Sequence, residues 1–377
     1  MDIQELREQI NGINDQMTKL FEQRMQVASQ IADYKKANNM MVMDASRERD
    51  IISTETDKVA PELQGYTKIL YHTLFDLSRS YQDQRLGGGE KLKEEIETAL
   101  NSTPQLFPEK AMVACQGVEG AYSSKAADKL FSMPKIIYMN SFKGVFQAVD
   151  KGLCQYGILP IENSLHGSVN EVYDLMKKYK FYIARSVKLQ INHSLLGNRG
   201  ADLSSIKEIV SHEQAIGQCA GFLEKLGVKI TVAENTAMAA KTVAQSGRND
   251  IAAIASKSCA DEYGLKVIES DIQDNDNNYT RFICISKNLQ IFPGANKISI
   301  MFNVSHRPGS LYSLISKFSA LGLNLTKLES RPIPGKDFEF MFYMDMEASI
   351  YSDAVKTLLS QLSSEEEVTF LGGYYEV

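Results

Sequence analysis

The chain has 377 residues, of which 44% are hydrophobic, so it can form two or three domains that each bury a core. Its net charge is -6 with both signs interspersed, which argues against binding to nucleic acids or to anionic membranes. Five cysteines, an odd number without CxxC spacing, indicate reduced thiols in a cytoplasmic protein. There is no signal-peptide pattern and no apolar run of about 18 residues, so we expect neither export nor membrane insertion.

Residues 1–86 are predicted to form an all-helical module. Apolar residues recur at three- and four-residue spacing from Asp2 to about Asn39, which predicts one long amphipathic helix. Its apolar stripe consists of Leu6, Ile10, Ile13, Met17, Leu20, Val27 and Ile31. At 1.5 Å per residue the helix would extend roughly 55 Å, so we expect a partner chain to cover it. The plain alternative is a coiled coil that only dimerises.

Three cations on this helix favour a binding site. Arg24 and Lys35 are about three turns apart, so both are expected on one face, along the buried stripe. A buried charge is costly unless an opposite charge meets it. Arg7 is expected to point roughly 100° away, toward the site of a neighbouring subunit.

Two further helices complete the module. Asp44 or Ser46 can cap a helix that carries Arg47 and Glu48, and Pro61 opens a third helix that extends to about Arg85. The third helix is expected to turn Leu63, Tyr66, Leu70, Leu74 and Leu77 inward, with Ser78 and Gln82 one turn apart on one side. Cations and polar donors in a helix-bundle core predict a pocket for a small dicarboxylate.

Residues 87–109 are interpreted as a linker. Gly87 to Gly89 fit neither GxxxxGK[ST] nor GxGxxG, so they predict a flexible tether rather than a phosphate loop. A charged segment that could be helical follows, and prolines then punctuate the entry to the next domain.

Residues 110–286 alternate between strand and helix patterns, which predicts an α/β domain with two lobes and a cleft between them. Strands are expected near 111–115, 135–138, 156–161, 181–189, 208–210, 229–232, 251–254 and 281–285. Helices are expected at 123–131, 142–151, 168–179, 214–226 and 236–246.

One stretch of this domain, residues 157–169, predicts a ligand site. A buried strand breaks at Pro160 and presents Glu162, Asn163 and Ser164 before a helix expected to start near Ser168. Ligands of open α/β sheets bind beyond the carboxyl ends of strands, and helix N-termini favour carboxylates. The plain alternative is an ordinary capped turn. No metal site is predicted, because Tyr279 occupies the glycine position of a calcium-loop-like segment and His193 and His212 lack ligand spacing.

Residues 287–377 show the order β-α-β-β-α-β, which is typical of a ferredoxin-like α+β domain. Strands are expected at 297–304, 325–330, 338–346 and 368–374, and helices at 310–321 and 350–362. The plain alternative is a small dimerisation domain.

These segments resemble three known families. The middle domain is similar to prephenate dehydratases, which are two-lobed and periplasmic-binding-like, in the following segments: Gly117-Val-Glu-Gly120-Ala-Tyr-Ser123, Phe142-Lys-Gly-Val-Phe146, Pro160-Ile-Glu-Asn-Ser164, Gly167, Ser211-His212-Glu-Gln214, Gln218-Cys219, Thr236-Ala237 and Thr280-Arg281-Phe282. Residues 3–85 resemble the all-helical chorismate mutases. His306-Arg307-Pro308-Gly309-Ser310-Leu311 and Glu329-Ser330-Arg331-Pro332 resemble the two phenylalanine-binding motifs of ACT domains.

The chorismate mutase resemblance implies a role for each matching position. Arg7 and Arg24 would hold the two carboxylates of chorismate, with Ser78 assisting at one of them. Arg47 would contribute positive charge, and Glu48 with the backbone near Asp44 would meet the ring hydroxyl. Lys35 and Gln82 would donate to the ether oxygen, whose negative charge grows as the Claisen rearrangement breaks the bond.

The dehydratase resemblance implies that Thr280 lies closest to the leaving hydroxyl of prephenate. Asn163, Ser164, Ser211 and Gln218 would position the substrate. Arg281, with helix N-termini near Ser123 and Ser164, is expected to anchor the side-chain carboxylate. Glu162 is a second candidate acid if burial raises its pKa.

The three resemblances together imply a bifunctional enzyme of phenylalanine biosynthesis that needs no cofactor. It would convert chorismate to prephenate and prephenate to phenylpyruvate, and L-phenylalanine would inhibit it through the ACT domain. We expect a homo-oligomer, because both terminal modules need a partner. One alternative is a non-enzymatic, two-lobed amino-acid sensor with a helical dimerisation stalk; another is a mutase fused to an inactive dehydratase-like domain.

Overall fold

The computed structural model describes residues 2–38, 44–85, 90–304, 309–333, 340–365 and 368–377. The chain divides into two compact units. One comprises Met1–Glu97, Phe302–Phe342 and Tyr351–Thr369, and the other comprises Thr98–Met301, Tyr343–Ile350 and Phe370–Val377.

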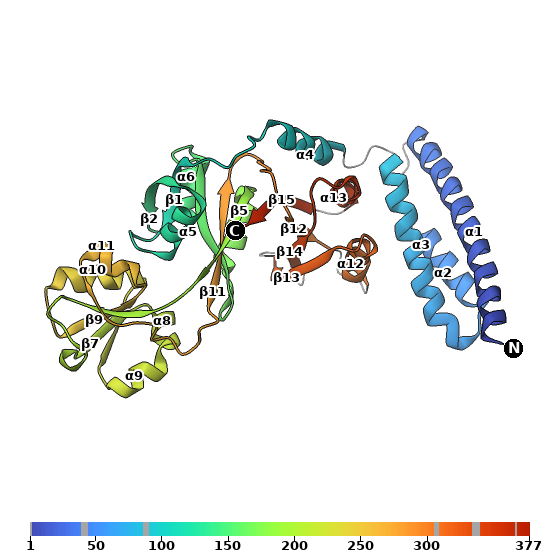
Figure 1. Ribbon diagram of the computed structural model, residues 1–377. Coiled ribbons are helices and arrows are strands. Elements are labelled where there is room, and N and C mark those ends of the chain that lie inside the picture. Colours follow the sequence, from blue (N-terminus) through green and yellow to red (C-terminus); the bar gives the residue numbers. More distant parts are fainter. Residues whose placement is uncertain (1, 39–43, 86–89, 305–308, 334–339, 366–367) are drawn as a thin grey trace. The chain divides into compact units, whose positions relative to one another are not determined.

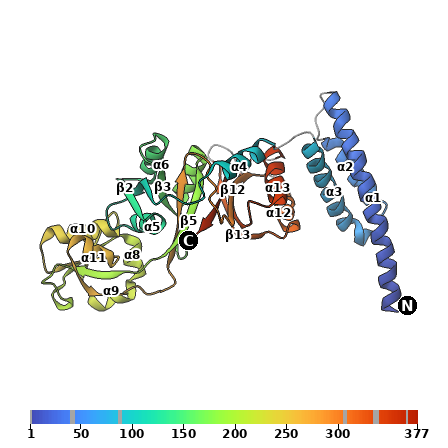
Figure 2. The ribbon, with the colours of Figure 1, turned by 45° about the horizontal axis from the view of Figure 1, so that its top comes forward.

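The N-terminal helices are α1 (Ile3–Ala37), α2 (Ala45–Thr56) and α3 (Gln64–Arg85), with a 3-10 turn η1 (Pro61–Leu63) before α3. Both ribbon views show α3 running alongside α1 (Figure 1, Figure 2). Asp44, one of the two residues predicted to cap α2, accepts a 3.0 Å hydrogen bond from the Arg47 N–H and so caps this helix. The predicted long first helix is therefore present, and the third begins one turn later than expected because Pro61 opens a 3-10 turn.

The faces that α1 and α3 bury differ from the prediction. Small side chains of α1, namely Ala28, Ser29 and Ala32, are buried instead of the predicted stripe, all of whose members are 43 to 64% exposed. On α3 the buried residues include Phe75, Ser78 and Gln82, while four of the five residues predicted to face inward are exposed: Leu63, Tyr66, Leu70 and Leu77. The inward orientation predicted for these α3 residues is not found within one chain. On α1, small residues let the two helices approach closely and leave uncovered the apolar stripe that a partner chain is expected to cover.

Part of the predicted linker is a helix. The charged segment that could be helical forms α4 (Glu90–Ser102), in which Ile96 and Ala99 are buried. Gly87, Gly88 and Gly89 lie outside the described residues.

The first sheet of the dehydratase-like segment contains β1 (Lys110–Gln116), β2 (Met133–Met139), β3 (Tyr156–Asn163), β5 (Tyr182–Gln190) and β11 (Tyr279–Ser286). β1 pairs in parallel with β2 and with β3, whereas β11 lies antiparallel between β3 and β5. The helices α5 (Tyr122–Leu130), α6 (Phe142–Asp150) and α7 (Asn170–Tyr179) accompany it, and the two-residue strand β4 (Gly167–Ser168) pairs with the end of β3. α7 therefore starts two residues after the predicted Ser168, because Ser168 is held in a ladder.

The second sheet has the order β10-β6-β9-β7-β8. Its strands are β6 (Ser194–Gly197), β7 (Glu208–Ser211), β8 (Lys229–Val232), β9 (Ile251–Ala255) and β10 (Lys266–Glu269), with a 3-10 turn η2 (Leu203–Ser205). Two helices, α10 (Thr236–Ser246) and α11 (Ser258–Tyr263), cover one face, and α8 (Glu213–Gln218) and α9 (Ala220–Leu226) cover the other (Figure 1). The predicted two-lobed α/β architecture is confirmed, with β5 leading into this lobe and β11 returning from it.

The C-terminal segment has the predicted element order. It contains β12 (Lys297–Asn303), α12 (Ser310–Ala320), β13 (Asn324–Pro332), β14 (Phe340–Glu347), α13 (Asp353–Glu365) and β15 (Val368–Glu376). Strands neighbour one another in the order β13-β14-β12-β15, and β15 lies next to β5. Tyr375 and Glu376 of β15 pair in parallel with Arg185 and Ser186.

Two further properties of the described residues concern their helices and their cysteines. None of the helices there is both long enough and apolar enough to cross a lipid bilayer. All five cysteines are free and buried.

We expect Gly372→Ala to destabilise the fold. Gly372 has φ 139°, and a Cβ atom there would lie 2.5 Å from the Ile183 carbonyl oxygen, so backbone strain and overlap combine to cost about 3 kcal/mol. Gly227→Ala is the control, because Gly227 also has a positive φ but no neighbour near its Cβ position, and about 1 kcal/mol is expected. Urea unfolding followed by circular dichroism measures both losses. Equal losses would show that the close approach of β15 to β5 does not require glycine.

Candidate active sites

The first candidate site lies where the C-terminal end of β3 meets the N-terminal end of β11. Asn163 pairs with Thr280 in the ladder, and Glu162 pairs with Arg281. Because successive side chains of a strand point to opposite faces, Asn163 and Thr280 occupy one face and Glu162 and Arg281 the other. The two catalytic candidates are therefore cross-strand neighbours.

The Asn163 amide is held in one orientation. Its Oδ1 accepts hydrogen bonds of 3.0 Å from the backbone N–H groups of Leu165 and His166, which fixes Nδ2 as the donor side. Nδ2 then donates to Asn278 Oδ1 at 2.8 Å and to Thr280 Oγ1 at 2.9 Å. Since Thr280 Oγ1 is the acceptor in this bond, the O–H proton of Thr280 remains able to point toward a ligand.

Ser164 joins the turn after β3 to the loop before β11. Its Oγ donates to the Asn277 carbonyl at 2.9 Å and accepts from the Tyr279 N–H at 2.9 Å. The expectation that Ser164 lies at a helix N-terminus is wrong, because α7 begins only at Asn170. Its hydroxyl instead fixes the loop that precedes Thr280.

Gln218 connects two histidines beside the same turn. Its amide lies 2.9 Å from His166 Nε2 and 2.7 Å from His193 Nε2. Burial lowers the pKa of His193, which the hydrogen bond to Gln218 opposes only in part, so this imidazole is neutral at neutral pH. The consistent assignment has His193 Nε2–H donating to Gln218 Oε1 and Gln218 Nε2 donating to His166. A pocket beside them is lined by Leu165, His166, Gly217, Gln218, Asp274 and Asn275.

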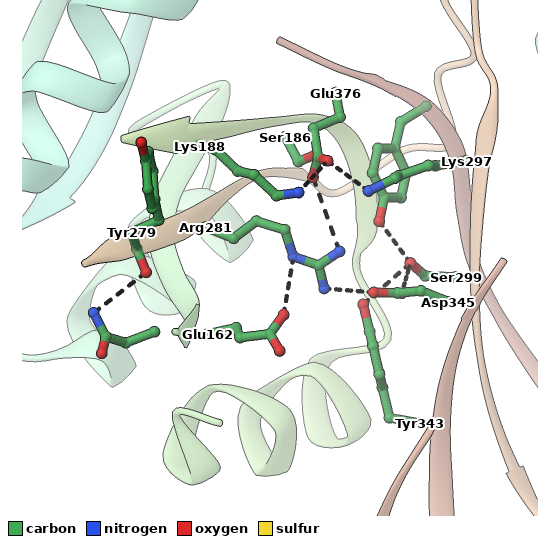
Figure 3. A network of polar contacts seen from close by, with 12 residues as sticks. Glu162, Ser186, Lys188, Tyr279, Arg281, Lys297, Ser299, Tyr343, Asp345 and Glu376 are labelled. Atoms are coloured by element: carbon green, nitrogen blue, oxygen red, sulfur yellow. Dashed lines mark hydrogen bonds and ion pairs between the residues drawn. The ribbon is translucent and has the colours of Figure 1, made fainter. Parts of the chain in front are cut away.

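Two predicted substrate ligands are placed elsewhere. Ser211 is fully buried and its hydroxyl donates to the Ile254 carbonyl at 2.7 Å, so it ties β7 to β9. Arg281 is only 5% exposed and lies 2.5 Å from Asp345 Oδ2 (Figure 3). Its place in the β3–β11 ladder puts it on the face opposite Thr280. Glu162, the second candidate acid, lies 3.6 Å from Arg281 and shares that face. The structure therefore corrects the prediction that Arg281 anchors the substrate carboxylate and that Ser211 contacts the substrate.

The second candidate site lies between α1 and α3. Arg24 donates to Ser78 Oγ and, at 3.0 Å, to the Leu74 carbonyl, and its guanidinium lies 5.6 Å from the centre of the Phe75 ring. Burial lowers the pKa of Arg24, and Tyr71 and Glu48 offset this in part. Gln82 is buried one turn after Ser78. The predicted cation and two predicted polar residues thus line the same inner face.

The other predicted residues of this site are less enclosed. Lys35 is half-buried, whereas Arg7, Asp44 and Arg47 are exposed. Glu48 forms an ion pair with Arg79, which also pairs with Asp76. Burial works against the charge of Arg79, but Glu48 and Asp76 outweigh it and raise its pKa. Among the described side chains predicted for this site, Ser78 and Gln82 are therefore buried and Arg24 is half-buried, while most of the others are exposed.

The two C-terminal motifs are partly described. Gly309 has φ 85° and directly precedes α12, which begins with Ser310 and Leu311. Glu329, Ser330, Arg331 and Pro332 form the end of β13. His306, Arg307 and Pro308 lie outside the described residues.

Sequence reasoning missed three residues of these sites. Asn278 is buried and accepts from Asn163, and His166 contacts Gln218. Their nearness to Thr280 and Ser164 in the sequence was a usable signal. Arg79 is three residues before Gln82, which is the spacing of neighbours on a helix. Since Gln82 and Glu48 were predicted to share one site, this spacing could have placed Arg79 there too. In the described part of the chain, no group of three or more His, Cys, Asp or Glu side chains could hold a metal ion.

Comparison with known proteins identifies both segments. The family model for chorismate mutase type II matches residues 6–83, and the model for prephenate dehydratase matches residues 113–290. An arogenate dehydratase/prephenate dehydratase of Arabidopsis thaliana is 39% identical over 271 residues, covering 69% of this chain and 70% of that protein. A prephenate dehydratase of Methanocaldococcus jannaschii is 37% identical over 270 residues, covering 69% of this chain and 96% of that protein.

A solved structure agrees with these matches. Prephenate dehydratase from Arthrobacter aurescens, in complex with L-Phe, superposes with a TM-score of 0.64 at 27% identity, covering 70% of this chain and 89% of that chain. The chain therefore belongs to the prephenate dehydratase family and carries a chorismate mutase module ahead of its dehydratase segment.

Proposed function

We propose how this bifunctional enzyme of phenylalanine biosynthesis divides its chemistry among its residues. It rearranges chorismate to prephenate, and it converts prephenate to phenylpyruvate with loss of CO2 and water. The observation that carries the proposal is the 2.9 Å hydrogen bond from Asn163 Nδ2 to Thr280 Oγ1. Because Thr280 Oγ1 accepts in this bond, its O–H at the start of β11 stays available to donate to a substrate.

In the dehydratase reaction Thr280 donates a hydrogen bond to the hydroxyl that leaves from the ring. Negative charge develops on that oxygen as the C–O bond breaks, so a fixed donor stabilises the transition state more than the substrate. A threonine is a poor proton donor by ionisation, so it acts as a hydrogen-bond donor or passes a proton on. Asn163 orients Thr280, Ser164 fixes the preceding loop, and Gln218 with His166 forms the adjoining wall.

In the mutase reaction no nucleophile or proton transfer is needed. Arg24, held against Ser78, binds one carboxylate of chorismate, and Lys35 and Gln82 donate to the ether oxygen. Folding the enolpyruvyl arm over the ring can contribute on the order of 7–11 kcal/mol, as in well-aligned model reactions. Arg47 adds positive charge, and Glu48 with the backbone near Asp44 binds the ring hydroxyl.

A second copy of the chain completes the mutase site. The apolar stripe of α1, defined above, is 43 to 64% exposed, which is unusual for a stable monomer surface. Arg7 is on the same helix and is exposed, so it is not on the face that Arg24 shares with Ser78 and Gln82. Pairing of two α1 helices would bury the stripe and bring Arg7 to the partner's site. The enzyme is accordingly a homo-oligomer with at least two chains.

The C-terminal segment serves as an ACT domain that binds L-phenylalanine. Its β-α-β-β-α-β order and the left-handed Gly309 before α12 suit a ligand carboxylate that approaches the backbone at a helix start. The relative from Arthrobacter aurescens, which was solved with L-Phe, supports this ligand. The residues from His306 to Leu311 and from Glu329 to Pro332 form the effector site, and occupancy favours a less active arrangement.

The enzyme works in the cytoplasm. The five cysteines are all free and buried, and free thiols are typical of proteins in a reducing compartment such as the cytoplasm.

Thr280→Ala should abolish dehydratase activity and leave mutase activity intact. With chorismate as substrate, the variant should accumulate prephenate, while the wild-type enzyme produces prephenate and then phenylpyruvate. Thr280→Ser keeps the hydroxyl and is the matched control, expected to retain most of the rate. Following both products over time separates the steps; equal loss of both activities in Thr280→Ala would point to misfolding or to a shared site.

Lys35→Ala should lower the mutase kcat by about 10²-fold or more, because the oxygen charge that Lys35 stabilises appears only in the transition state. Dehydratase kcat with added prephenate is the internal control and should not change. Steady-state assays of chorismate disappearance measure the effect. A mutase rate within twofold of wild type would remove Lys35 from the mechanism.

L-phenylalanine should inhibit the dehydratase, and D-phenylalanine at the same concentration should not, because a chiral pocket recognises the amino group and carboxylate together. Initial rates with prephenate, with and without each enantiomer, give the result. No inhibition by millimolar L-phenylalanine would leave the C-terminal segment with a structural role.

A further inference from the structure

Arg281 is the centre of a buried ion network on the face of β11 opposite Thr280. Its side chain is 5% exposed, and its guanidinium lies 2.5 Å from Asp345, 3.6 Å from Glu162 and 4.0 Å from Glu376. Figure 3 shows the guanidinium between Glu162 on one side and Asp345 on the other. A cation buried this deeply requires opposite charge close by.

Asp345 is the partner with the strongest hold. It is fully buried on β14 and is the carboxylate nearest to Arg281. Glu162 and Glu376 lie farther away, and Glu162 is 35% exposed. The second oxygen of Asp345 accepts a hydrogen bond of 2.5 Å from Ser299 Oγ. The Ser299 hydroxyl also lies 2.7 Å from Tyr374 OH, and Tyr343 OH donates to it at 3.1 Å. Burial raises the pKa of both tyrosines, so they stay neutral and can donate.

Two lysines balance the remaining charge. Lys297 Nζ lies 2.5 Å from Glu376 Oε1, and Lys188 Nζ lies 3.1 Å from the same oxygen. Burial acts to raise the pKa of Glu376, but these lysines outweigh it and lower the pKa overall. The network thus holds equal numbers of cations and anions, and its members come from β3, β5, β11, β12, β14 and β15. It connects the strands of the dehydratase sheet with strands of the C-terminal segment.

The network adjoins an irregularity in the pairing of β11 with β3. The partners of consecutive residues Arg281 and Phe282 are Glu162 and Pro160, so Ile161 is passed over at this point. Such a bulge alters which way the neighbouring side chains point, and a shift of one residue would turn Thr280 to the wrong face. Ion pairs that hold Arg281 in place therefore determine where the hydroxyl of Thr280 lies.

We propose that Asp345, acting through Arg281, is a positioning residue for the dehydratase reaction. It holds β11 in the register that sets Thr280 against Asn163, from a strand outside the dehydratase segment. Asp345 touches no reacting atom. The inference rests on the proposed role of Thr280, because the benefit of the register is the placement of that hydroxyl.

The test is Asp345→Asn, which keeps the shape of the side chain and removes its charge. Dehydratase kcat with prephenate should fall about 10- to 100-fold, as expected when a catalytic group is displaced by about 1 Å. KM should change less than about threefold, because the groups that bind substrate are untouched. Amide hydrogen exchange of the β11 segment from Tyr279 to Ile283 should become faster.

Val113→Ala is the control for a general loss of stability. Val113 is fully buried in β1 of the same sheet, in an apolar cluster that includes none of the charged residues of the network. This variant should lower the thermal midpoint while dehydratase kcat stays within about twofold of wild type and exchange in β11 stays slow. Asp345→Glu, which retains the carboxylate, should keep a higher kcat than Asp345→Asn.

Two results would overturn the proposal. One is a dehydratase kcat for Asp345→Asn within twofold of wild type. The other is a Val113→Ala variant that has the same thermal midpoint as Asp345→Asn and loses as much dehydratase kcat. If Thr280→Ala kept its activity, the role of Thr280 would fail, whereas the exchange measurement would still report whether Asp345 holds β11.

Discussion

The antiparallel pairing of β11 with β3 is the contact on which the proposed dehydratase site depends. It brings together Asn163 and Thr280, which are 117 residues apart in the chain, through a hydrogen bond of 2.9 Å. The same ladder places Glu162 and Arg281 on the other face, so one pair of strand ends carries a catalytic arrangement and an ion network back to back. A sheet allows this because consecutive side chains alternate between its faces.

Buried charge is handled differently at the two sites. Arg24 is only half-buried, and its hydrogen-bond partners are a hydroxyl and a carbonyl, so neither of them neutralises its charge, which suits its proposed role in binding a substrate carboxylate. Arg281 is almost fully buried and is neutralised by carboxylates of the protein itself, so it has no charge to offer a ligand. The difference follows from desolvation: a guanidinium that cannot reach water must be paired at all times.

In the proposed mechanism, both reactions depend on hydrogen-bond donors and cations that are fixed before the substrate arrives. Asn163 shows how such a donor is fixed, because two backbone N–H groups bind its Oδ1 and prevent the amide from turning. The mutase module is organised less completely within one chain, since its predicted stripe is exposed and Arg7 lies on the surface. Preorganisation there requires burial that a single α1 helix does not provide.

Local sequence determined much of this protein. Helical periodicity specified α1, alternating patterns specified the two-lobed domain, and β-α-β-β-α-β order specified the C-terminal segment, because each depends on residues close together in the chain. The motifs around Asn163 and Thr280 also singled out two residues that the fold brings within hydrogen-bond distance, and their role in the dehydratase reaction stays a prediction. Only the tertiary structure decided which face of α1 is buried, that Ser211 bonds to Ile254, and that Arg281 meets Asp345. Periodicity assigns residues to a face, but which partner covers that face, and whether a charge is paired there, depends on strands and helices that lie far away in the sequence.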